Sequence, residues 1–158
     1  MTGFLSQREL INRCFKQGNN CFYHATFRKY MSDIRKNGLV CNNTHRNWEC
    51  EDGLYFGLDI NICASFCDAA EDVPEEVFDS GIVVLAIPII HLDLRLLFLD
   101  PNNLDNYDAS LKDDLNHYTL RYTGNISPNN LGIVQFKPEI KLISLKDVQR
   151  VTDKYLWS

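Results

Sequence analysis

The segment Gly-Leu-Tyr-Phe-Gly-Leu-Asp at residues 53–59 most constrains the fold, because it predicts a short strand that turns directly into a helix. Leu, Tyr and Phe at 54–56 favour a strand, and the glycines on either side indicate a turn or a close approach of the backbone to another group. Asp59 is a favourable N-cap for the helix. The apolar residues that follow share one helical face: Ile60, Cys63, Ala64 and Cys67. Taken alone, the segment is typical of a core strand leading into a core helix.

Length and charge restrict the class of protein. At 158 residues the chain is long enough for one domain with its own core, which we expect to span residues 1–158. The net charge of −5 excludes a general basic surface for nucleic acid, and no apolar run is long enough to cross a bilayer. Residues 1–16 do not read as a secretory signal, and six irregularly spaced cysteines indicate free thiols. We therefore expect a cytoplasmic protein, in the producing cell or in a host cell, without a membrane partner.

Apolar periodicity and turn residues predict helices near the front of the chain and short strands towards its end. A capping box at Ser6–Glu9 begins a helix that runs to about residue 16, with Leu10, Ile11, Cys14 and Phe15 on its buried side. Further helices are expected at 30–37, at 60–70 and from residue 144, and the acidic stretch 70–80 is expected to be a linker. Strands are expected at 21–25, 54–56, 81–90, 94–99, 117–123, 132–136 and 140–143.

The apolar run at 81–90 predicts a central strand buried on both faces. The sum is an α+β protein with flanking helices, in which two small antiparallel sheets pack face to face. Cys41, His45 and Cys50 match no zinc pattern, and we expect no metal site.

Three segments together carry a family resemblance. The first is Tyr23-His24-Ala25-Thr26, followed by a predicted helix and Asn37-Gly38-Leu39. The second is Gly53-Leu54-Tyr55-Phe56 with a helix that holds Ala64-Ser65-Phe66, and the third is Tyr122-Thr123-Gly124-Asn125-Ile126-Ser127-Pro128. In this order, over residues 21–134, they resemble the motifs of the ADP-ribosyltransferase superfamily. The likeness is closest to the diphtheria-toxin-like branch that includes the poly(ADP-ribose) polymerases.

The resemblance implies a split β-sandwich, an ADP-ribosyltransferase-like fold with NAD+ in its cleft. His24 would hydrogen-bond a ribose hydroxyl of NAD+, and the Tyr55 ring would stack on the nicotinamide. The catalytic residues it implies are His24, Tyr55 and Thr123. The residues it implies for NAD+ binding are His24, Ala25, Thr26, Gly38, Leu39, Gly53, Tyr55, Phe56 and Ser65. The chemistry agrees, because a neutral histidine both donates and accepts hydrogen bonds and a tyrosine ring offers contact area at little entropic cost.

The chain departs from the family pattern in one respect. Active members carry a glutamate near the start of the last motif, whereas residues 117–128 hold no acidic side chain. Thr123 occupies roughly the catalytic place, with Arg121 and Tyr122 beside it. Carboxylates elsewhere in the sequence that could substitute are Glu49, Glu51 and Asp100.

We therefore expect a transferase, an NAD+-dependent mono-ADP-ribosyltransferase that releases nicotinamide and modifies a macromolecular acceptor, a protein rather than a nucleic acid. By analogy, a lone domain of this kind is an effector, toxin or modifying enzyme. Two alternatives stay open. One is a tRNA 2′-phosphotransferase-like enzyme, for which Arg28 and Arg121 are the candidate phosphate-binding residues. The other is a catalytically inactive module that binds NAD+, ADP-ribose or a protein partner.

Overall fold

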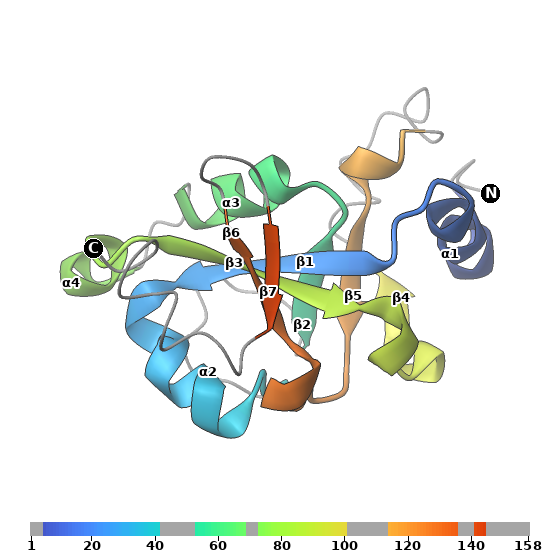
Figure 1. Ribbon diagram of the computed structural model, residues 1–158. Coiled ribbons are helices and arrows are strands. Elements are labelled where there is room, and N and C mark those ends of the chain that lie inside the picture. Colours follow the sequence, from blue (N-terminus) through green and yellow to red (C-terminus); the bar gives the residue numbers. More distant parts are fainter. Residues whose placement is uncertain (1–4, 42–52, 69–72, 101–113, 136–140, 145–158) are drawn as a thin grey trace.

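Strand β3 (Ile82–Pro88) lies in the interior of a seven-stranded sheet with the order β4-β5-β2-β1-β3-β6-β7 (Figure 1). The computed structural model describes residues 5–41, 53–68, 73–100, 114–135 and 141–144. Residues 83–87 are all buried. Leu85 and Ile87 face the main core, and Val84 and Ala86 pack in a second cluster on the other face of the sheet. The predicted central strand is therefore confirmed.

The other strands are short, and every pairing between neighbours is antiparallel. They are β1 (Cys21–Phe27), β2 (Leu54–Gly57), β4 (Leu97–Leu99), β5 (Thr119–Tyr122), β6 (Gly132–Gln135) and β7 (Lys141–Ser144). β1 pairs with β3 along its whole length, whereas a single register pair, Tyr23 with Gly57, joins β1 to β2. The sheet thus divides at this pair into a three-stranded part, β4-β5-β2, and a four-stranded part, β1-β3-β6-β7.

The α+β class is confirmed, but the expectation of two separate sheets needs correction, because this pair connects the two parts into one sheet. Both parts contribute to one main core, which contains Phe22 and Leu85 from the four-stranded part and Phe56 and Leu120 from the three-stranded part. The rings of Phe22 and Phe56 stack with centroids 6.4 Å apart, across the junction. The two parts therefore share their hydrophobic stabilisation.

Helix α1 (Gln7–Lys16) begins where the capping box predicts. The Ser6 side chain accepts a hydrogen bond from the Glu9 backbone N–H, and Leu10, Ile11 and Cys14 are buried. Phe15 was expected on the buried side, but its side chain is 49% exposed. At about 100° per residue, Phe15 lies about 40° beyond Ile11 around the helix and so falls outside the buried stripe of Leu10, Cys14 and Ile11.

The remaining helices cover the faces and ends of the sheet (Figure 1). They are α2 (Met31–Asn37), which follows a 3₁₀ turn at Arg28–Tyr30, α3 (Ile60–Asp68) and α4 (Glu75–Phe78). The carboxylate of Asp59 caps α3 by accepting from the Ile62 backbone N–H at 2.9 Å, as the sequence predicts. Helix α4 corrects the expectation of a linker at 70–80, because its Val77 is buried and holds this short helix on the core.

The predicted strand at 94–99 is only half strand. Leu94–Leu96 forms a 3₁₀ turn whose N-cap is Asp93, and β4 begins after it. Further 3₁₀ turns are Ile89–His91, Leu115–His117 and Pro128–Asn130. The helix expected from residue 144 falls outside the described residues. Within the part of the chain that the structure describes, no helix has the length and apolar character needed to cross a membrane.

Candidate active site

β1 and β2 part after their single register pair, and His24 lies where they part. One residue beyond Tyr23, the Nδ1 atom of His24 lies 2.8 Å from the backbone carbonyl oxygen of Tyr55. A side chain of β1 therefore reaches this β2 carbonyl. The hydrogen bond directly joins the first motif segment to the second.

This hydrogen bond determines the protonation pattern of His24. A carbonyl oxygen only accepts, so Nδ1 carries the hydrogen and donates it. Burial lowers the pKa of His24 below 6.5, and the opposing effect of the bond to Tyr55 is smaller. The ring is therefore neutral near pH 7, and its Nε2 atom is a hydrogen-bond acceptor. Such an acceptor suits a hydroxyl group of a ligand.

Core aromatic rings hold the imidazole from one side. The His24 ring meets Phe56 edge to face, with centroids 6.2 Å apart and an interplanar angle of 85°. Phe56 in turn stacks on Phe22 and on Tyr122, and only 1% of its surface is exposed. The resemblance implies that Phe56 binds NAD+; in the structure its buried side chain contacts the His24 ring.

Tyr55 is partly exposed and stands on the face of β2 opposite to its neighbours Leu54 and Phe56, which both belong to the main core. Its register partner on β5 is Arg121, so these two side chains share one face of the sheet. The imidazole of His24 contacts the Tyr55 backbone. The imidazole therefore lies against the strand that carries the Tyr55 ring, where β1 and β2 part.

The two glycines that flank residues 54–56, Gly53 and Gly57, are explained by close approach of the chain to itself. A Cβ atom on Gly53 would lie 2.6 Å from Cγ of Arg121 and 3.2 Å from the carbonyl oxygen of Tyr122. A Cβ atom on Gly57 would lie 2.5 Å from Sγ of Cys63 in α3. Gly53 thus packs the second motif against the strand that carries the start of the third.

The first and third motif segments also meet. Leu39 and Ile126 form an isolated antiparallel bridge, in which each backbone N–H donates to the other residue's carbonyl at 3.0 and 2.9 Å. Gly38 has φ of 75°, and a Cβ atom there would lie 2.0 Å from the Ile126 oxygen. The side chain of Leu39 is buried in the main core, so these two predicted NAD+-binding residues pair the motifs.

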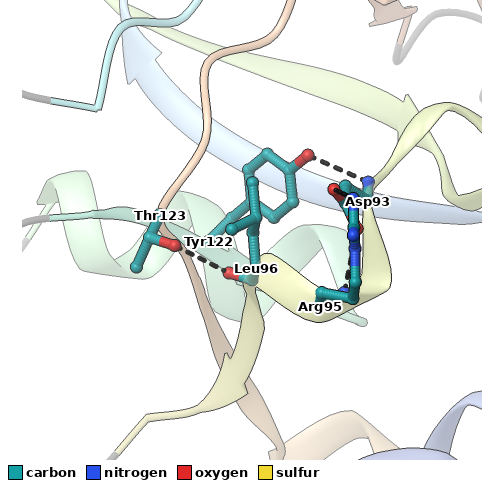
Figure 2. Close-up of polar contacts among 5 residues, drawn as sticks. All are labelled: Asp93, Arg95, Leu96, Tyr122 and Thr123. Carbon is teal, nitrogen blue, oxygen red and sulfur yellow. Dashed lines mark hydrogen bonds and ion pairs between the residues drawn. The ribbon is translucent and has the colours of Figure 1, made fainter.

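Thr123 follows β5 and bonds to the turn before β4 (Figure 2). Its backbone N–H and its hydroxyl both donate to the carbonyl oxygen of Leu96, at 2.9 and 3.2 Å. Among the described residues, the hydrogen bonds of Thr123 thus tie β5 to this turn, and none of them reaches His24. The catalytic role that the resemblance implies for Thr123 stays a prediction.

The β5 residues that share the face of Tyr55 are Thr119 and Arg121, paired with Gly57 and Tyr55 respectively. The resemblance named neither as catalytic. The signal was present in the sequence, because the buried alternation of Tyr118, Leu120 and Tyr122 puts the intervening residues on the other face.

Of the three carboxylates that could replace the missing glutamate, only Asp100 lies within the described residues. Glu49 and Glu51 fall outside the described residues. Asp100 is buried at the end of β4, and its backbone N–H donates to the Thr119 carbonyl at 3.0 Å. Asp100 therefore lies two strands away from β2 in the sheet order.

Of the remaining predicted binding residues, Ala25 and Thr26 lie on β1 and Ser65 lies on α3. Ala25 packs between two core clusters, and Thr26 pairs with Val83 of β3. Ser65 is exposed on α3, where its hydroxyl donates to the Ile62 carbonyl of its own helix at 2.6 Å. No contact of the described residues brings Ser65 to His24.

In the described part of the chain, no group of three or more histidine, cysteine or acidic residues is arranged to hold a metal ion. Cys41 is described, whereas His45 and Cys50 are not. No protein-family model matches the chain, and a comparison with curated proteins finds no match either.

Proposed function

We propose that the protein is an NAD+-dependent mono-ADP-ribosyltransferase with an ADP-ribosyltransferase-like fold. The observation that carries the proposal is the hydrogen bond from His24 to the Tyr55 carbonyl, at the point where β1 and β2 part. It presents a neutral imidazole with a defined acceptor atom next to a partly exposed tyrosine. The contacts that pair Gly38 and Leu39 with Ile126 support the same proposal, since they join the first motif segment to the third, far apart in the sequence.

The reaction breaks the bond between C1′ of the ribose and the nicotinamide nitrogen. Nicotinamide leaves with the bonding electron pair, and a nucleophilic oxygen or nitrogen of the acceptor forms the new bond to C1′. Nε2 of His24 would accept a hydrogen bond from a ribose hydroxyl and hold the sugar while positive charge develops on it. The ring of Tyr55 would offer a flat surface to the nicotinamide.

The absence of an acidic residue from β5 restricts how the acceptor is activated. The positive charge on the ribose needs a negative group nearby, and β5 supplies none from its four residues, Thr119–Tyr122. We therefore propose that the acceptor brings its own negative group, a carboxylate or a phosphate. A protein side chain fits this requirement, and the compartment that we propose is the cytoplasm of the producing cell or of a host.

The test is release of nicotinamide from NAD+ by the purified full chain, with and without a cell lysate as a source of acceptor. We expect release that depends on the lysate, together with label transfer from NAD+ labelled in the adenylate part. His24→Ala should abolish both, whereas His91→Ala, which alters an exposed histidine, should not. If NAD+ raises the melting temperature but no nicotinamide is released with any acceptor, the protein is a binding module and the enzyme proposal fails.

A second candidate is transfer to an acceptor that already carries a phosphate, as in a tRNA 2′-phosphotransferase-like reaction. The observation that favours it is the register pair of Tyr55 with Arg121, which puts a guanidinium on the same face as the proposed stacking ring. Guanidinium groups bind phosphate oxygens through paired hydrogen bonds. Label transfer to a 2′-phosphorylated oligonucleotide, lost in Arg121→Gln, would favour this reaction over protein modification.

A further inference from the structure

Tyr122 connects the candidate active site to the surface. Its ring stacks on Phe56 with centroids 5.9 Å apart and an angle of 26°, and Phe56 holds the edge of His24. Its hydroxyl accepts a hydrogen bond from the backbone N–H of Asp93 at 3.0 Å. Figure 2 shows this hydroxyl pointing towards Asp93. A continuous series of contacts thus runs from the turn at Asp93 to the imidazole.

The outer end of this series is itself tightly held. The Asp93 carboxylate accepts a hydrogen bond from the Arg95 backbone N–H at 3.1 Å. It accepts two more from the Arg95 guanidinium, from Nε at 3.0 Å and from Nη2 at 2.8 Å. Leu96, at the end of the same turn, accepts both hydrogen bonds of Thr123. Two contacts therefore fix the turn to the end of β5 (Figure 2). Asp93 bonds to the Tyr122 hydroxyl, and Leu96 bonds to Thr123.

Gly124 shows how closely the ring is packed. A Cβ atom there would lie 2.9 Å from Cε2 of Tyr122 and 3.0 Å from Cδ1 of Leu96. A side chain at position 124 would therefore collide with both residues. The Tyr122 ring is thus closely packed between Phe56, Leu96 and the backbone of Gly124.

We propose that Tyr122 is a positioning residue, which sets the orientation of the His24 imidazole through Phe56 and couples it to the surface turn Asp93–Leu96. The consequence for catalysis rests on the proposed function, whereas the positioning itself does not. Since the ring and the hydroxyl make separate contacts, their roles separate by substitution. Tyr122→Leu removes both, and Tyr122→Phe removes only the bond to Asp93.

Tyr118 offers a matched control. It is equally buried, and its hydroxyl also accepts from a backbone N–H, that of Leu5 at 3.1 Å. It precedes β5, whereas Tyr122 pairs with Leu54 inside the ladder. Tyr118→Phe therefore removes the same kind of hydrogen bond, in the same core, from a ring that is not part of the stack on Phe56.

The experiment records the NMR signals of the carbon-bound ring hydrogens of His24 in the full chain without NAD+, then the kinetics of nicotinamide release. We expect Tyr122→Leu to shift the His24 signals and to lower kcat about tenfold with little change in KM, as expected for loss of catalytic alignment. Tyr122→Phe should shift the signals less, and Tyr118→Phe should leave them unchanged although it also lowers the melting temperature.

Two results would overturn the proposal: unchanged His24 signals in Tyr122→Leu, or signals that move as far in Tyr118→Phe as in the Tyr122 variants. If Tyr122→Leu does not fold, the comparison of Tyr122→Phe with Tyr118→Phe decides, and equal His24 signals in these two overturn the proposal. If the His24 signals move as expected but no form of the protein releases nicotinamide, the positioning stands and the proposed function fails.

Discussion

At His24, two features of the structure act in opposite directions on the same proton. Burial lowers the pKa of the imidazole, and the bond to the Tyr55 carbonyl raises it by a smaller amount. The outcome is a ring that stays neutral in the folded protein at a pH where the unfolded chain already binds a proton. This single residue therefore makes the stability of the protein depend on pH.

The free energy of unfolding should fall as pH falls from 6.5 through the lowered folded pKa of His24, because the unfolded state then binds more protons than the folded state. In His24→Gln this contribution is absent. Urea denaturation at a series of pH values between about 7 and about 5 should therefore give a shallower pH dependence for His24→Gln than for the parent chain. His91→Gln serves as the control. An unchanged slope in His24→Gln would contradict the assignment of a partly buried, neutral imidazole.

The ring of Tyr55 should contribute to NAD+ affinity. Tyr55→Ala should weaken binding by about 1–3 kcal/mol, the usual cost of losing a stacked base, which corresponds to roughly 5-fold to 150-fold in Kd. Tyr55→Phe keeps the aromatic ring and should retain most of the affinity. Isothermal titration with NAD+ measures both variants. Equal affinity of the parent chain and Tyr55→Ala would remove Tyr55 from the site.

At the scale of elements, local patterns predict much of the fold. The capping box at Ser6, the cap at Asp59 and the apolar run of β3 each predict an element that the structure confirms, because their information lies in neighbouring residues. The helix α4 was missed, since only its Val77 is buried and its other residues resemble a charged linker.

The site was less predictable than the fold, because it depends on pairing between distant segments. The bond of His24 to the Tyr55 carbonyl and the bridge of Leu39 with Ile126 join residues that no local pattern relates. The role implied for Thr123 stays a prediction, and only the register of β5 against β2 shows that Arg121 is the β5 residue paired with Tyr55. Sequence spacing along β5 therefore predicts which residues share a face of the sheet, but it does not predict which β2 residue lies opposite each of them.

Two glycines at helix ends both have a positive φ, but only Gly38 lies in close contact with another segment of the chain. Gly18 and Gly38 have φ of 78° and 75°, but a Cβ atom on Gly18 would meet nothing within 4 Å. Gly18→Ala should lower the free energy of unfolding by about 1–2 kcal/mol, the cost of the left-handed conformation. Gly38→Ala should cost roughly a further 1–3 kcal/mol, because it must displace Ile126. Denaturant titration of both variants tests this, and equal losses would contradict the close contact of the two motifs.

For the molecule as a whole, the reactivity of the buried cysteines shows whether the core is accessible to solvent. The five described cysteines are free, and burial raises the pKa of Cys14 to about 11 and that of Cys63 and Cys67 to about 12. Thiols of this kind carry almost no thiolate near neutral pH, and the thiolate is the reactive form. These three side chains should therefore be unreactive for as long as the fold is intact.

A variant with Cys21, Cys41 and Cys50 replaced by serine carries only these three buried thiols. In native buffer at about pH 8 its reaction with a disulfide reagent should be slow, since unperturbed thiols have a pKa of about 8.5. After addition of guanidinium chloride, all three should react rapidly, and absorbance of the released thiolate follows both phases. Rapid reaction of the native variant would contradict the packing of α1 and α3.

The two parts of the sheet are interleaved along the polypeptide. The four-stranded part takes its strands from residues 21–27, 82–88, 132–135 and 141–144, and the three-stranded part takes its own from the intervening stretches at 54–57, 97–99 and 119–122. No single cut of the chain separates the two parts, because strands of the four-stranded part both precede and follow those of the three-stranded part. A fragment that stops before β6 would leave β3, the most deeply buried strand, bare along one edge. Such fragments should aggregate when expressed alone, because an uncovered apolar edge recruits other chains.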